Sequence, residues 1–126
     1  MKKKIELYNV KTLKELYDKN INLSKYLKDY LEVDNNTEDI IELIYEIQSG
    51  SYINQVEKNM EKSKYYSSQL SNILGKHINT NHSLLDIGAG EMTTLSLVLN
   101  DLDIKPKITF AFDISWSRIY CGNFFV

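Results

Sequence analysis

Apolar residues recur at intervals of three and four through residues 10–74, which is the spacing of one face of an α-helix. Within residues 10–32 the spacing is interrupted at Asn20 and Asn22. Two short helices are therefore predicted there, and Asn22 or Ser24 would cap the second one.

Two further helices are predicted in the first half of the chain. The first begins after Asn36 or Thr37, either of which can act as its N-cap, and it ends at Gly50. The second is predicted as one long helix over residues 52–74, closed by Gly75 in the left-handed conformation. Its apolar residues are expected to share a buried face: Val56, Met60, Tyr66, Leu70, Ile73 and Leu74.

After residue 80 the pattern changes to short apolar runs separated by glycine and polar residues. Residues 83–87 and 107–113 are predicted as buried parallel strands, with a helix over 92–100 between them and another from Ser117. The predicted fold class is therefore α/β. The expected parts are an N-terminal helical segment, 1–80, and a strand–helix–strand unit, 81–126.

Composition and charge narrow the classes of partner. Of the 126 residues, 43% are apolar and 25% are charged, as in an ordinary globular protein. The formal net charge of −2 gives no basic excess for nucleic acid, and no apolar run is long enough for a membrane span. The single cysteine, Cys121, fits a reducing cytoplasm. His77 and His82 lie far from it along the chain, so no metal site is expected.

The candidate chemistry lies where the first predicted strand meets the following helix. Gly88 and Gly90 would let the backbone turn sharply there, and they leave room for a ligand to approach. Asp113, at the end of the second predicted strand, would be placed to accept hydrogen bonds from both hydroxyls of a ribose. Together these positions favour a ligand that contains a nucleoside.

Two such ligands are distinguished by the residues around the turn. A dinucleotide turn has a third glycine, where this chain has Thr93. Asp86, two positions before Gly88, would disfavour a pyrophosphate. The same carboxylate suits the cationic sulfonium and ammonium groups of S-adenosylmethionine.

Residues 84–90, Leu-Leu-Asp-Ile-Gly-Ala-Gly, resemble the first motif of the class I S-adenosylmethionine-dependent methyltransferases, and residues 112–113 resemble the acidic end of their second strand. Residues 91–94 and 113–118 resemble those of small bacterial methyltransferase-domain proteins, some of them linked to surface-sugar pathways. The resemblance implies a Rossmann-like fold and S-adenosyl-L-methionine as cofactor.

The resemblance also implies a role for each candidate residue. The glycine turn would lie against the methionine part of the cofactor, Asp113 would bind the ribose, and the three residues after Asp113 would flank the adenine. Asp86 would orient the turn and hold the amino end, and Tyr52 would close over the cofactor. The expected cofactor-binding residues are Tyr52, Asp86, Gly88, Ala89, Gly90, Glu91, Asp113, Ile114, Ser115 and Trp116. Arg118, the only arginine, is expected to pair with Asp113 or Glu91 and not with substrate.

The complete fold of that family is longer than this chain. We therefore expect an N-terminal part, truncated after the second strand, whose catalytic residues and acceptor pocket lie elsewhere. The acceptor is expected to be a small molecule or a sugar-related compound. Two alternatives stay open: a non-catalytic fragment that self-associates, and a nucleoside-binding module. Because the strand edges would be unpaired, a homo-oligomer is expected, meeting through residues 107–113 or 124–126.

Overall fold

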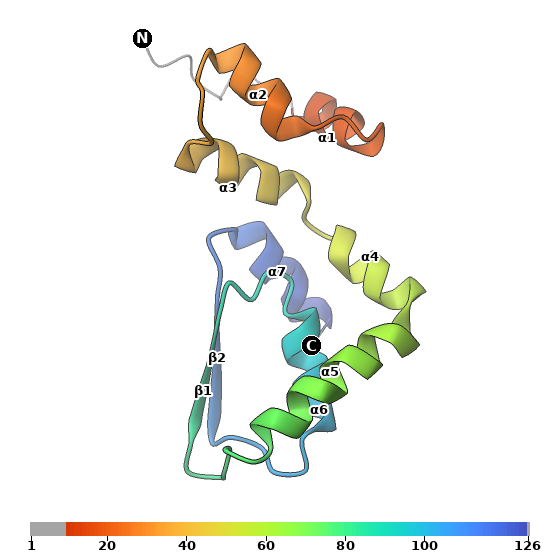
Figure 1. The fold of residues 1–126 in the computed structure, drawn as a ribbon, viewed down its shortest axis with the longest axis vertical. Coiled ribbons are helices and arrows are strands. Elements are labelled where there is room, and N and C mark those ends of the chain that lie inside the picture. Colours follow the sequence, from red (N-terminus) through yellow and green to blue (C-terminus); the bar gives the residue numbers. More distant parts are fainter. Residues whose placement is uncertain (1–9, 126) are drawn as a thin grey trace. The chain divides into compact units, whose positions relative to one another are not determined.

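The structure, a computed structural model, describes residues 10–125 (Figure 1). The chain divides into two compact units, with the division between residues 48 and 49. The elements are α1 (Val10–Asp18), α2 (Leu23–Leu31), α3 (Glu38–Ile47), α4 (Ser51–Lys58), α5 (Met60–Leu74), β1 (Ser83–Ile87), α6 (Thr93–Asp101), β2 (Ile108–Phe112) and α7 (Trp116–Phe125).

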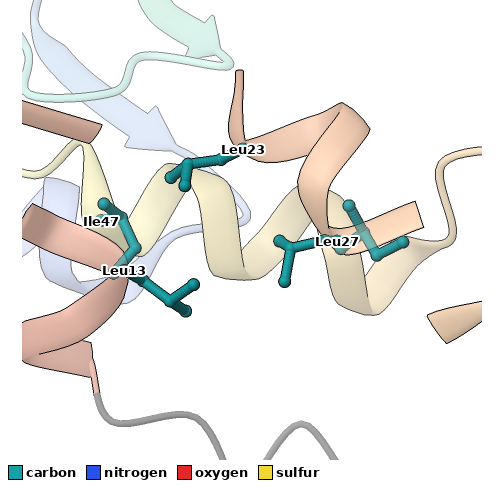
Figure 2. Packing of buried hydrophobic residues seen from close by; sticks show 5 residues of the cluster. Leu13, Leu23, Leu27 and Ile47 are labelled. Atoms are coloured by element: carbon teal, nitrogen blue, oxygen red, sulfur yellow. The ribbon is translucent and has the colours of Figure 1, made fainter. Parts of the chain in front are cut away.

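The first unit is a small helical cluster formed by α1, α2 and α3. The helix break predicted near Asn20 is confirmed, and the side chain of Asn22 accepts a hydrogen bond from the N–H of Lys25 at 3.0 Å. Thr37 caps α3 in the same way. The buried apolar side chains of this unit are Leu13, Leu23, Leu27, Ile40 and Ile47, and Figure 2 shows them packed among the helices.

The predicted long helix over residues 52–74 is wrong, because the structure has two helices there. Asn59 separates α4 from α5 with a backbone conformation, φ −127° and ψ 40°, that is not helical. Its side-chain amide donates a hydrogen bond to the carbonyl of Gln55 at 3.1 Å. Asparagine competes with the helix for backbone partners in this way, which accounts for a break at this residue.

The predicted apolar face of α5 is only partly buried, since Met60 and Leu74 are half-buried. Tyr66, Leu70 and Ile73 are exposed, whereas the buried residues are Ser67 and Ser71. The hydroxyl of Ser71 donates to the carbonyl oxygens of residue 67 at 2.9 Å and of residue 98, in α6, at 3.4 Å. The small serine side chains let α5 approach α6 closely, so hydroxyls replace apolar groups in this contact.

Gly75 differs from its predicted conformation as well. Its φ of −59° and ψ of −22° are right-handed, because the backbone continues into a turn beyond the helix. The N–H groups of His77 and Ile78 both donate to the carbonyl of Leu74. This turn leads the chain from α5 toward β1.

The predicted parallel pairing of the two strands is confirmed. β1 and β2 form a two-stranded sheet in which Ser83 pairs with Ile108 and Ile87 with Phe112. Figure 1 shows α5, α6 and α7 on one side of this sheet. The other face carries Leu85, Ile87, Ile108, Phe110 and Phe112, which are exposed, so the strands are not fully buried as the apolar runs predict.

The unit that contains the sheet begins earlier than the sequence predicts. The expected division at residue 80 lies inside the second unit, because α5 packs on α6. The fold is thus α/β, mostly helical, with one small parallel sheet. In the described part of the chain, no helix is long and apolar enough to cross a membrane.

Candidate functional site

The turn between β1 and α6 is tied to the end of β2. Gly88 and Gly90 have φ values of +77° and +55°, a region that glycine enters without the steric cost of a side chain. The N–H groups of Gly88 and Ala89 both donate to the carbonyl of Phe112, at 2.8 and 2.9 Å. Met92, the N-cap residue of α6, also has a positive φ, of +54°. These bonds hold the turn at the carboxyl ends of both strands.

Asp113 joins this turn to the start of α7. One carboxylate oxygen accepts a hydrogen bond from the N–H of Gly90 at 2.8 Å, and the other accepts from the N–H of Ser115 at 2.9 Å. Ser115 is fully buried, and its hydroxyl accepts from the N–H of Arg118 at 3.3 Å. Each oxygen of Asp113 has a second lone pair, so the carboxylate can accept further hydrogen bonds.

Asp86 lies on β1, two positions before the turn, and is half-buried. Burial raises the pKa of its carboxyl above the ordinary value, and the negative charge of Asp113 raises it further. Both effects disfavour the charged form, so a cation bound nearby would relieve a cost that the free protein carries. The two carboxylates predicted from the sequence are therefore brought together at one end of the sheet.

Glu91 is the buried acid of the site. Its two carboxylate oxygens accept hydrogen bonds from the N–H of Gly50 at 2.8 Å and of Ile53 at 2.9 Å, at the start of α4. Its side chain is fully buried and lies 3.7 Å from Nε of Arg118. The ion pair expected for Arg118 is thus formed with Glu91. The sequence predicts Glu91 as a cofactor contact, but the structure uses its carboxylate to hold α4.

Tyr52 and Gly90 both contact the Arg118 guanidinium. The central carbon of that group lies 4.8 Å from the centre of the Tyr52 ring. A Cβ placed on Gly90 would come within 2.7 Å of one of its terminal nitrogens. A side chain at 90 would therefore displace the guanidinium from the turn, and the φ of +55° itself favours glycine there. Tyr52 is 44% exposed, so the structure places an accessible aromatic ring near the turn.

The residues after Asp113 have different environments. Ile114 and Trp116 are exposed, Trp116 by 72%, so Trp116 does not belong to the core. Its ring stacks on Tyr120, one helical turn later, at 5.0 Å between centroids. Ala89, in the turn itself, is half-buried. Of the predicted adenine contacts, Ile114 and Trp116 are accessible to a ligand, whereas Ser115 is not.

Three residues of this site escape sequence reasoning. Gly50 and Ile53 contribute backbone N–H groups, which leave no signal in the sequence and lie some forty positions from Glu91. Gly122 brings α7 against the turn, since a Cβ there would lie 2.7 Å from the carbonyl oxygen of Glu91. A glycine inside a predicted helix is the one available signal, because it often marks a close approach.

Neither a cluster of metal-ligating side chains in the described part of the chain nor a known relative identifies the ligand of this site. Among the residues that the structure describes, no group of three or more histidine, cysteine or acidic side chains could hold a metal ion. No protein-family model, curated protein or solved structure matches the chain.

Proposed function

We propose that this chain binds S-adenosyl-L-methionine and is the N-terminal part of a class I methyltransferase with a Rossmann-like fold. The observation that carries the proposal is the hydrogen bond from Gly90 N–H to Asp113. It joins a glycine turn and an acidic side chain at the carboxyl ends of two adjacent parallel strands, where α/β proteins bind their ligands.

The donors of the turn support a ligand without phosphate at this point. The N–H groups of Gly88 and Ala89 already donate to Phe112, and that of Gly90 donates to Asp113. A pyrophosphate would need such donors. It would also meet the carboxylates of Asp86 and Asp113. A sulfonium and an ammonium group would be stabilised by the same carboxylates.

The residues fit the cofactor in the following roles. Asp113 would accept hydrogen bonds from the ribose hydroxyls through its remaining lone pairs, and the exposed side chains of Ile114 and Trp116 would flank the adenine. The turn would contact the methionine part, with Asp86 near its amino group. Tyr52 would close over the cofactor. Glu91 and Ser115, both buried, would act by holding other residues in place.

When bound, S-adenosylmethionine supplies a methyl group on a cationic sulfur, and S-adenosylhomocysteine is the product. The leaving group is already activated, so the protein contributes mainly alignment and exclusion of water. We propose a small-molecule or sugar-related acceptor and a cytoplasmic location. No residue of this chain is assigned as the base that would deprotonate the acceptor.

Calorimetric titration tests the proposal with wild type and Asp113→Asn. We expect wild type to bind both S-adenosylmethionine and S-adenosylhomocysteine, and the variant to lose about tenfold or more in affinity for each, because both ligands carry the ribose. Asp103→Asn, which changes an exposed acid, is the matched control. Thermal melting of each variant separates lost binding from lost folding, since Asp113 also holds the turn.

Titration with NAD and ATP distinguishes the alternatives. Equal affinity for all four ligands would favour a general nucleoside-binding module. Failure of wild type to bind any of them would overturn the proposed function.

A further inference from the structure

The buried carboxylate of Glu91 connects two parts of the site that are distant in sequence. Its oxygens accept hydrogen bonds from the N–H groups of Gly50 and Ile53. These two residues flank Ser51 and Tyr52 in the sequence. We infer that Glu91 is a positioning residue: it fixes the first turn of α4, and with it Tyr52 and Arg118, beside the glycine turn. The order of α4 and occupancy of the cofactor site are thereby coupled.

The start of α4 relies on this contact because its N-cap residue, a glycine, offers no side chain to the first turn. Gly50 occupies the N-cap position with φ of +84°, and no side chain from the N-cap bonds to the first turn. The first N–H groups of a helix need acceptors, and a negative charge is favourable at that end. Glu91, which is distant in sequence but within hydrogen-bond distance of Gly50 and Ile53, supplies both. Removing its charge would therefore loosen α4 before it affects the rest of the fold.

A chain of contacts leads from Glu91 to the proposed ligand site. Arg118 lies against Glu91 at 3.7 Å and under the ring of Tyr52 at 4.8 Å. The same guanidinium packs on Gly90, whose N–H donates to Asp113. A ligand that contacts Tyr52 and Asp113 would thus stabilise both ends of this series of contacts. Because such coupling is reciprocal, any change that orders α4 must raise the affinity for the ligand by the same factor.

Hydrogen exchange of the backbone amides tests the contact without ligand. In wild type we expect the amide hydrogens of Gly50 and Ile53 to exchange more slowly than is usual for the first residues of a helix. In Glu91→Gln, which keeps one acceptor oxygen but loses the charge, protection at one or both should fall by about tenfold. Glu57→Gln removes an exposed carboxylate from α4 itself and is the matched control. Equal protection in wild type and Glu91→Gln would overturn the inference.

The coupling itself is tested with S-adenosylhomocysteine, and this step rests on the proposed function. Binding to wild type should raise protection at Ile53, a measurement that needs no variant. Glu91→Gln should weaken binding by about tenfold, and Glu57→Gln by less than about twofold. If Glu91 acts through Tyr52, the loss caused by Glu91→Gln should shrink in a Tyr52→Ala background.

The two failures give different results. In the first, wild type binds tightly while Glu91→Gln loses the same affinity in the wild-type and Tyr52→Ala backgrounds. That result would show that Glu91 does not act through Tyr52. It would overturn the coupling and leave the proposed function standing. If wild type does not bind but Glu91→Gln still loses protection at Ile53, the proposed function fails and the coupling fails with it. Glu91 would then be a helix cap alone.

Discussion

Three carboxylates lie around the glycine turn, and each has a different environment. Asp113 accepts two backbone N–H groups, and Glu91 accepts two more and faces Arg118. Asp86 is the exception, because burial and the neighbouring Asp113 both raise its pKa. A group that is held in an unfavourable charge state lowers the stability of the free protein, and such groups are frequent at binding sites.

The raised pKa of Asp86 predicts a pH dependence of stability. Because the folded state holds the proton of Asp86 more tightly than the unfolded state, the contribution of Asp86 to stability should fall as the pH rises above about 3.8, the unperturbed value. Above the folded-state pKa the loss should be complete and constant. Asp86→Asn removes the titrating group, so its melting temperature should exceed that of wild type at pH 7.

Melting curves of both proteins between pH 3 and pH 7 measure this effect. The advantage of Asp86→Asn should shrink toward zero near pH 3, where wild type is protonated in both states. Asp103→Asn is the control at an exposed position. An advantage that is equal at pH 3 and pH 7 would show that the charge of Asp86 is not its cause.

The sequence predicts some of the contacts of these carboxylates and not others. The approach of Gly90 to Asp113 follows from their places at adjacent strand ends. For Arg118 the sequence leaves two partners open, Asp113 and Glu91, and only the structure selects Glu91. The hydrogen bonds from Gly50 to Glu91 do not follow, because a backbone N–H has no residue type. Only the tertiary structure brings it to the carboxylate.

At the scale of elements, local sequence signals predict the positions of most helices and of both strands. They do not predict correctly which face of an element is buried. The N-caps at Asn22 and Thr37 are short-range features, and the structure has both. The face of α5 depends on its partner, α6. The apolar pattern predicts the wrong residues here, because Ser67 and Ser71 are the buried residues of α5 while Ile73 is 58% exposed.

The serine contact between α5 and α6 gives a test of this face. Ser71→Leu should destabilise the second unit by about 1–3 kcal/mol, because a larger side chain must fit where the helices lie close. Ile73→Ser, at a position that the apolar pattern predicts as buried, should cost less than about 1 kcal/mol.

Urea unfolding followed by the fluorescence of Trp116, the only tryptophan, reports on the second unit in these variants. A larger loss for Ile73→Ser than for Ser71→Leu would mean that α5 packs through its apolar face in solution.

At the scale of the whole molecule, the sheet has more apolar surface than its own helices cover. Five apolar side chains of β1 and β2 are exposed on one face. With two strands, each also has one edge without a partner among the described residues. Parallel sheets are normally covered on both faces, and unprotected edges promote association. This surface would be covered either by further strands, as the proposed methyltransferase fold requires, or by a second copy of the chain.

We propose that a second copy of the chain pairs with the free edge of β2. The strand Ile-Thr-Phe-Ala-Phe contains no charge, proline or glycine, the features that prevent edge pairing, so nothing in it opposes an antiparallel pairing with itself. The other predicted contact, residues 124–126, begins at the exposed Phe124 and extends outside the described residues.

Sedimentation velocity at micromolar concentrations tests the pairing through β2. Wild type should sediment as a dimer that dissociates on dilution. Phe110→Lys places a charge beside the edge at a position that is 53% exposed, so the fold should tolerate it while the dimer is lost. Tyr65→Lys, which also replaces an exposed aromatic residue with lysine but in α5, should leave the dimer intact. A wild type that stays monomeric at every concentration would contradict the proposal, and a dimer that survives Phe110→Lys would place the contact elsewhere, with Phe124 as the next position to change.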